Sequence, residues 1–140
     1  MPEISQRHEG FLKAHHDLGL MPHAELEVRS GFAAAQAYEA AKRLIASGAA
    51  FDGVVAGSDV IAMSAMRALS EAGRRIPSEV GVVGFDDVEM AAYTTPPLTT
   101  VRQDLARGAL LLVEKIIAAA AGEAPASIEM PAELIVRGST

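Results

Sequence analysis

Two short apolar runs, one on each side of an amphipathic stretch, most strongly limit what this chain can fold into. Residues 53–57 and 80–85 are apolar throughout rather than alternating, which is typical of strands covered by helices on both faces. Between them, a helix is expected to begin at Ser58 or Asp59 and to end before Gly73. This strand–helix–strand order predicts an α/β fold built on a parallel sheet.

The rest of the chain up to this unit also reads as helices and a strand. Apolar residues at helical spacing predict a helix over residues 3–18, and residues 25–28 are a short strand candidate. Ser30 is a plausible N-cap for a second helix that ends at Gly48. The residues expected to share one face of that helix are Phe32, Ala35, Tyr38 and either Ala41 or Leu44.

The last third of the chain carries a wide apolar helix and a final strand. Residues 105–120 have apolar side chains over much of the helix surface, and Gly122 ends the run. Residues 133–137 read as the final strand. So wide an apolar face needs extensive cover. We therefore expect the chain either to pair with a second copy or to be part of a longer protein.

Composition and charge exclude several classes of protein. The 140 residues are enough for one domain, and 50% are hydrophobic, so the chain is expected to fold. A formal net charge of -6, with the 12 Lys and Arg residues scattered, argues against nucleic-acid binding by this segment alone. The absence of cysteine excludes disulfides and thiolate zinc sites, and it fits a reducing compartment such as the cytoplasm. No apolar run reaches the roughly 20 residues of a membrane span, and the N-terminus lacks signal-peptide features.

The sequence patterns of common catalytic and metal sites are missing. Four histidines within residues 8–23 lack the spacing of a metal site and are expected to be solvated or to pack. The segment around Ser58 lacks the second glycine of a serine-hydrolase elbow, and the glycines of residues 81–84 lie inside a strand. We expect no metal, no cofactor and no enzymatic activity. A small α/β enzyme that uses Asp59 or Asp86 as acid or base is the minor alternative.

The carboxyl ends of the two predicted strands are where a ligand is expected, because loops and helix N-termini meet there. Asp86 follows an apolar strand, so its carboxylate can accept two hydrogen bonds from a polyhydroxylated ligand or from the N–H groups of a heterocycle. The alternative for such an Asp is to cap the helical turn near Val88, a role that we assign to Asp87. For Ser58, N-capping and ligand contact both remain open.

Three motifs together resemble one family of proteins. They are DGVVAGSDVIAMSAMRAL at residues 52–69, RRIPSEVGVVGFDD at 74–87 and PPLTTVRQD at 96–104. Their order and spacing resemble the effector-binding region of LacI/GalR-type transcription regulators, bacterial proteins that bind a small sugar-like or purine-like molecule and thereby release or grip DNA. The resemblance covers residues 1–140 but only part of the family layout.

The resemblance implies an incomplete type I periplasmic-binding-protein-like fold. Residues 1–101 and 132–140 correspond to the C-terminal lobe, and residues 102–131 belong to the N-terminal lobe in the family. A helix-turn-helix headpiece precedes these lobes in the family, so DNA binding would come only through that absent part. The expected partners are a small-molecule effector and a second copy of the chain in a homodimer. The alternative function is a solute-binding module of the periplasmic sugar-binding type.

The resemblance also implies five effector-contacting positions: Arg7, Leu26, Ser58, Asp86 and Gln103. Arg7 opens a segment similar to the family's Arg-x-x-Gly-aromatic element, where a guanidinium can bind a hydroxyl pair or a carboxylate; the alternative is a solvated arginine. Asp86 and Ser58 match positions whose side chains reach the family's pocket. Gln103 falls where the chain crosses between lobes, and it is either an effector contact or a hinge residue. Leu26 stands where some members stack an aromatic ring, which leucine lacks.

Overall fold

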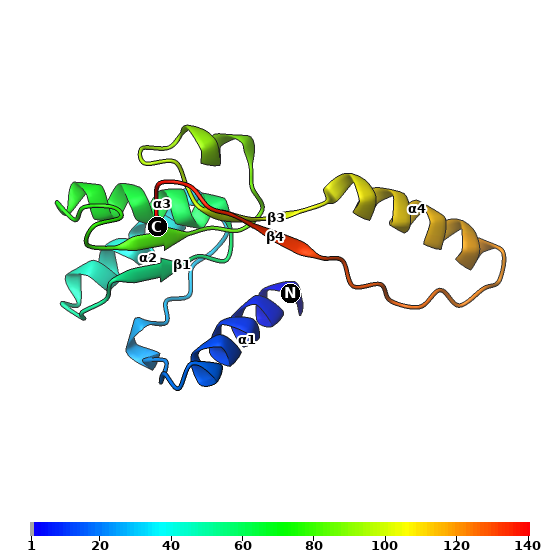
Figure 1. The fold of residues 1–140 in the computed structure, drawn as a ribbon, viewed down its shortest axis with the longest axis horizontal. Coiled ribbons are helices and arrows are strands. Elements are labelled where there is room, and N and C mark those ends of the chain that lie inside the picture. Colours follow the sequence, from blue (N-terminus) through cyan, green and yellow to red (C-terminus); the bar gives the residue numbers. More distant parts are fainter. Residues whose placement is uncertain (1) are drawn as a thin grey trace.

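The computed structural model describes residues 2–140 as an α/β body from which one helical arm extends (Figure 1). The elements in chain order, with η marking 3-10 helices, are α1 (Pro2–Asp17), η1 (Ala24–Leu26), α2 (Ala34–Ala46), β1 (Gly53–Val55), α3 (Asp59–Glu71), β2 (Gly81–Val83), η2 (Glu89–Tyr93), β3 (Thr100–Gln103), α4 (Leu105–Ala120) and β4 (Ala132–Ile135).

Parallel pairing organises the body, as the strand–helix–strand pattern predicts. β1 pairs with β2 in parallel, with Gly53 opposite Gly81, and Val83 forms a further parallel bridge with Thr99. β3 pairs with β4 in antiparallel register, with Thr100 opposite Ile135. The two strands run side by side away from the body toward α4 (Figure 1).

The core lies where α3 packs on β2 and on the segment that leads into β3. Leu69 of α3, Val82 of β2 and Leu98 are almost completely buried in one cluster. The expectation that helices cover both faces of the strands is wrong for β1, because Val55 is 64% exposed while its neighbour Val54 packs against the core. Among residues 2–140, the cluster that Val54 packs against includes Leu69 of α3, and Ile45 of α2 packs on it too.

Local signals explain most helix ends. The Ser58 hydroxyl accepts a hydrogen bond from the Ile61 amide at 3.3 Å and so caps α3, one of the two roles that the sequence left open for it. Gly19, Gly48 and Gly73 follow α1, α2 and α3 with φ of 68°, 75° and 74°, a left-handed conformation that glycine adopts at low cost.

Two expectations for residues 20–35 are wrong. Residues 25–28 form no strand; the chain makes η1 there, because no neighbouring strand within residues 2–140 pairs with it. Ser30 is not the N-cap of α2, since the helix begins after Ala33 without a side-chain cap. Phe32 therefore lies outside the helix and is 57% exposed, and the buried face of α2 is made by small residues, Ala37 and Ala40, that allow close packing on α3.

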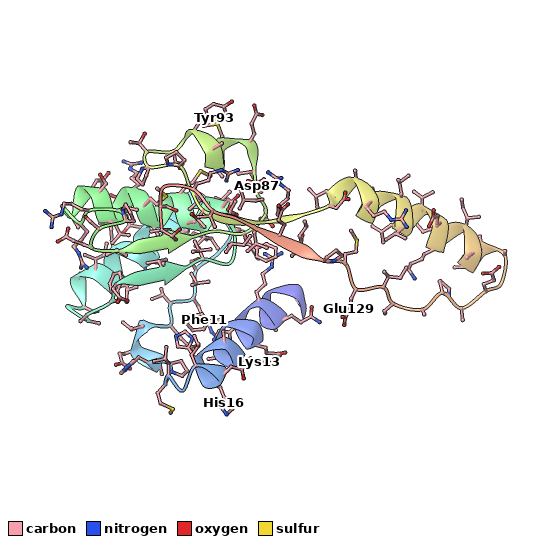
Figure 2. All side chains as sticks on the ribbon, in the orientation of Figure 1. Phe11, Lys13, His16, Asp87, Tyr93 and Glu129 are labelled. Carbon is pink, nitrogen blue, oxygen red and sulfur yellow. The ribbon has the colours of Figure 1, made fainter. Side chains whose placement is uncertain are left out.

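α4 is the part of the molecule that the body does not cover. None of its residues is buried, and Ile116 and Leu112 are 67% and 63% exposed. It touches its own return segment, where the Lys115 ammonium donates to the Ala126 carbonyl. Most of its large apolar side chains are exposed (Figure 2). Although α4 is apolar, no helix within residues 2–140 has the length and hydrophobicity to cross a membrane.

Candidate functional site

Two loops lie against each other at the carboxyl ends of β1 and β2. The Ala56 amide donates to the Val83 carbonyl at 2.9 Å, and the Asp59 amide donates to the Phe85 carbonyl at 2.7 Å. These bonds continue the parallel pairing beyond the strands. They bring the two loops singled out from the sequence to one edge of the sheet, where ligands bind in open α/β folds.

Arg7 of α1 reaches across to both loops. Its Nη1 donates to the Gly57 carbonyl at 2.6 Å, and its Nη2 lies 3.7 Å from Oδ1 of Asp86. Its guanidinium carbon stands 3.7 Å from the centre of the Phe85 ring, a cation–π contact. We call Arg7, Gly57, Phe85 and Asp86 the Arg7 cluster. It holds a donor fork, a carboxylate and an aromatic ring at one edge of the sheet.

Asp86 is strained and only partly paired. Its φ is 112°, a value that side-chain-bearing residues rarely adopt, while its amide donates to the Val101 carbonyl at 2.9 Å. Its side chain is 38% exposed. Burial raises the pKa of Asp86 above its usual value; the Arg7 charge opposes this rise, and the Asp59 charge adds to it. Backbone strain together with an incompletely paired carboxylate is typical of functional sites.

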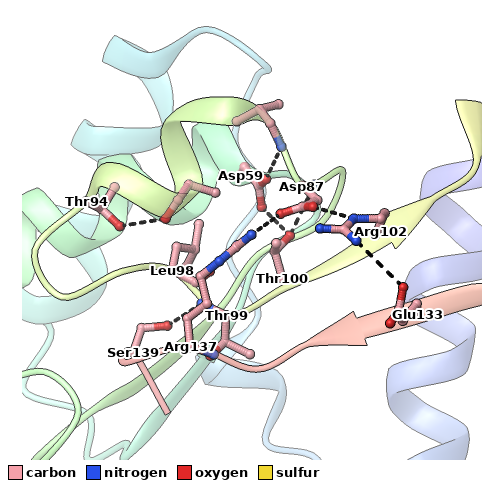
Figure 3. A network of polar contacts seen from close by, with 12 residues as sticks. Asp59, Asp87, Thr94, Leu98, Thr99, Thr100, Arg102, Glu133, Arg137 and Ser139 are labelled. Atoms are coloured by element: carbon pink, nitrogen blue, oxygen red, sulfur yellow. Dashed lines mark hydrogen bonds and ion pairs between the residues drawn. The ribbon is translucent and has the colours of Figure 1, made fainter.

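Asp59 is a buried structural carboxylate at the start of α3 (Figure 3). Its Oδ1 accepts from the Thr100 hydroxyl at 2.5 Å, and its Oδ2 accepts from the Val88 amide at 2.8 Å. Gly84 makes room for it, because a Cβ there would lie 2.1 Å from Asp59 Oδ1. Each oxygen of Asp59 thus accepts a hydrogen bond from a group of the chain itself.

Asp87 joins this loop to the strands of the arm. Its Oδ2 accepts from Nε of Arg102 and its Oδ1 from Nη2 of Arg137, both at 2.6 Å. Burial alone would raise the pKa of Asp87, but the hydrogen bonds from Arg137 and Arg102 outweigh it and lower the pKa. The assignment of Asp87 as the cap of the turn near Val88 is wrong, because Asp59 accepts the Val88 amide instead. We call the following set the Asp87 junction: Asp59, Asp87, Thr100, Arg102 and Arg137 (Figure 3).

The structure brings together some of the five residues proposed from the sequence and not others. Arg7 and Asp86 form an ion pair, and Ser58 follows the Gly57 carbonyl that Arg7 contacts. Gln103 lies at the end of β3, exposed, with Ala132 opposite it. Leu26 is half-buried in η1. Among residues 2–140, no hydrogen bond or ion pair joins the Gln103 side chain to the Arg7 cluster.

Sequence reasoning singled out Arg7 but missed Phe85 and Arg137 at this edge. Phe85 directly precedes Asp86 in the motif, and an aromatic residue beside a proposed ligand residue is a signal that pointed to it. Arg137 lies 50 positions from its partner Asp87, and no local pattern links the two. A long-range ion pair of this kind becomes visible only in the fold.

The histidines lie apart from this edge. His8 lies 3.3 Å from Glu27 and so links α1 to the residue that follows η1. Within the described residues, no group of three His, Cys, Asp or Glu side chains is placed to hold a metal ion.

Comparison with known proteins gives consistent matches along the whole chain. A family model described as a periplasmic binding protein-like domain matches residues 2–140. The HTH-type transcriptional repressor PurR of Pasteurella multocida (strain Pm70) is 33% identical over 137 residues, which are 95% of this chain and 40% of that protein.

Solved structures agree with this match. The transcriptional regulator CelR in its cellobiose complex superposes with a TM-score of 0.90 at 28% identity, over 97% of this chain and 42% of that chain. The lac repressor dimer bound to operator and the anti-inducer ONPF superposes with a TM-score of 0.88 at 27% identity, over 96% of this chain and 46% of that chain. The chain therefore spans less than half the length of each of these proteins.

Proposed function

We propose that the Arg7 cluster contacts a small-molecule effector. The premise is that this chain belongs to the periplasmic binding protein-like domain family and is of the LacI/GalR regulator type. The observation that carries the proposal is the meeting of Arg7 and Asp86 at the carboxyl ends of β1 and β2. The chain would thus form the effector-sensing part of a transcription regulator, and DNA binding would come from a headpiece outside these residues.

The chemistry of the Arg7 cluster suits a sugar-like or nucleobase-like effector. Asp86 can accept a pair of hydrogen bonds from neighbouring hydroxyls or ring N–H groups, and Arg7 offers a donor fork. Ser58 and Gln103 are further candidate contacts, with hydroxyl and amide groups. Leu26 offers only apolar contact, so an aromatic platform would come from Phe85. The cellobiose complex of CelR supports the sugar-like option.

A second lobe would close this site. In this proposal, residues 1–101 and 132–140 form one lobe, and residues 102–131 belong to the opposite lobe of the regulator. Two observations support the division: β3 and β4 lead away from the body, and α4 has no buried residue. The effector would then bind between the lobes and favour one of their arrangements, in proportion to its affinity for each.

We also propose that the regulator works as a homodimer. Apolar side chains lie exposed on η2 and at the start of α3, where Met90, Tyr93 and Val60 are 59%, 72% and 38% exposed. Single exposed apolar residues are common, but exposed apolar side chains can also pair with those of a second copy. One similar structure is that of a lac repressor dimer bound to operator.

A thermal-shift screen of the complete regulator tests the proposed function. The panel contains hexoses, disaccharides including cellobiose, sugar phosphates, and purine bases. At least one compound should raise the melting temperature, because a ligand that binds only the folded state stabilises it by mass action. The same compound should give a clearly smaller shift with the Asp86→Ala variant and a full shift with Asp52→Ala, an exposed Asp at the opposite end of β1. A regulator that no compound of the panel stabilises would contradict the proposal.

A further inference from the structure

The Asp87 carboxylate is held by two arginines at once. Each of its oxygens accepts one guanidinium N–H at 2.6 Å, from Arg102 on one side and from Arg137 on the other. Its side chain is only 8% exposed, so water competes little for these bonds. A carboxylate held on both oxygens fixes the orientation of its own backbone, which here is left-handed with φ of 52°.

One arginine lies on β3 and the other just beyond β4, and these two strands connect the body with α4. Arg102 lies on β3 and also pairs with Glu133, its opposite residue on β4, at 3.8 Å. Arg137 follows β4 by two residues, and its Nη1 donates to the Leu98 carbonyl at 2.8 Å. Both strands entering and leaving the arm are therefore tied to the same carboxylate (Figure 3).

Asp87 directly follows Asp86 in the chain, so the position of one residue constrains the position of the other. The Asp86 amide donates to the Val101 carbonyl, one residue before Arg102. The Asp87 amide lies 3.4 Å from the Thr100 hydroxyl. Asp86 and Asp87 both have positive φ, and this unfavourable backbone conformation persists only while such contacts hold the two residues.

We infer that Asp87 is a positioning residue: by clamping its loop to Arg102 and Arg137, it holds Asp86 against Arg7 and makes that contact depend on the placement of β3 and β4. A displacement of β3 and β4 would then change the position of the Asp86 carboxylate, which contacts the effector. An effector bound to Asp86 would in return favour one placement of these strands. This inference rests on the proposed function for its link to the effector, but the positioning itself is a property of the chain without ligand.

The test compares two backbone amides by hydrogen exchange in wild type and in the Asp87→Asn variant of the complete protein. Asparagine tolerates the left-handed backbone, so the variant removes the charge with little added strain. We expect the Asp86 amide, which donates to Val101, to exchange about tenfold faster, because the loop opens locally. The Val82 amide, which donates to the Ser139 carbonyl at 2.8 Å in the same body, should change much less. A merely structural loss of stability would instead speed both amides equally.

A second readout follows the Arg7–Asp86 contact directly by NMR titration of the Asp86 carboxyl. In the wild type, Arg7→Gln should raise the pKa of Asp86, because the Arg7 charge lowers it. In the Asp87→Asn background the same substitution should raise the pKa by less, since Asp86 has moved from Arg7. In an Arg102→Gln background, the rise in the Asp86 pKa should be partly reduced. In an Arg102→Lys background the rise should return to its wild-type size, and Arg107→Gln on exposed α4 should leave it unchanged.

The inference would be overturned if both amides exchanged equally faster in Asp87→Asn. It would also be overturned if Arg7→Gln raised the pKa of Asp86 by the same amount in the Asp87→Asn background as in the wild type. Neither measurement uses an effector. The positioning role can therefore fail while effector binding at Asp86 is confirmed, and it can hold even if no compound of the panel binds.

Discussion

The Arg7 cluster and the Asp87 junction lie at the same edge of the sheet, yet their carboxylates are held in opposite ways. In the junction, Asp59 and Asp87 have both oxygens occupied by donors from the chain itself. In the Arg7 cluster, Asp86 faces one arginine at 3.7 Å and is 38% exposed. The pKa of Asp87 is lowered and that of Asp86 is raised.

The difference separates scaffold from proposed binding site. A carboxylate that the fold saturates stabilises the fold, and its removal leaves donors without partners. A carboxylate that the fold strains and leaves partly unpaired costs stability, a cost that proteins tolerate where a ligand uses the group. The three predictions that follow test whether the two regions differ in this way.

Asp59→Ala should have the largest effect on the free energy of unfolding. The substitution leaves the Thr100 hydroxyl and the Val88 amide without an acceptor in a buried place. We expect a loss of about 2–4 kcal/mol in urea unfolding, because each lost bond to a charged group costs about 1.5–3 kcal/mol before relaxation. The exposed Asp52→Ala should change stability by less than about 0.5 kcal/mol. Equal losses of stability in Asp59→Ala and Asp52→Ala would contradict a stabilising role for Asp59.

Asp87→Asn should cost about 1–2 kcal/mol at pH 7, since Arg102 is half exposed and its bond is partly screened. The cost should depend on pH in a defined direction. The folded pKa of Asp87 lies below the usual 3.8, so its stabilisation is present above that value and is lost as pH falls through the folded pKa. Urea titrations of wild type and variant should therefore converge in acid. Curves that stay parallel down to pH 2 would contradict the assignment.

Asp86→Asn should have the smallest effect, and the opposite sign. The folded pKa of Asp86 lies above 3.8, so the ionised carboxylate costs stability as pH rises through the folded pKa, and this cost is absent below 3.8. Because the group is over one-third exposed, screening limits the gain at pH 7 to about 0.5 kcal/mol. A difference scan of melting temperature against pH measures it. A lower melting temperature of Asp86→Asn at neutral pH would show that the Asp86 carboxylate stabilises the fold, which would contradict the comparison.

Local sequence patterns predicted the parts of this molecule that local physics decides. The two apolar runs, the Ser58 cap and the glycine at position 73 define a unit whose elements need only their neighbours. Residues 25–28 have strand-like composition but no strand to pair with, so the prediction failed there. Ser30 failed as a cap because helix α2 starts where its small residues can pack on α3.

The candidate site shows the same division. The place of Asp86 at the end of a strand followed from a local pattern, and the motif around Arg7 singled out that residue, which the fold brings to Asp86. The buried role of Asp59 depends on Thr100, 41 positions away, and the clamp on Asp87 depends on Arg137, 50 positions away. Contacts between distant segments follow from the fold, so sequence reasoning assigned the helix-turn cap to the wrong aspartate.

Calorimetric titration of the compound that gives the largest thermal shift tests the central claim most directly. The account predicts that the Asp86→Ala regulator binds this compound about 10–100-fold more weakly than wild type, the loss expected for hydrogen bonds to a charged group. Asp52→Ala should bind with wild-type affinity. An Asp86→Ala regulator that is folded and binds the compound as tightly as wild type would contradict the claim that this edge of the sheet contacts the effector.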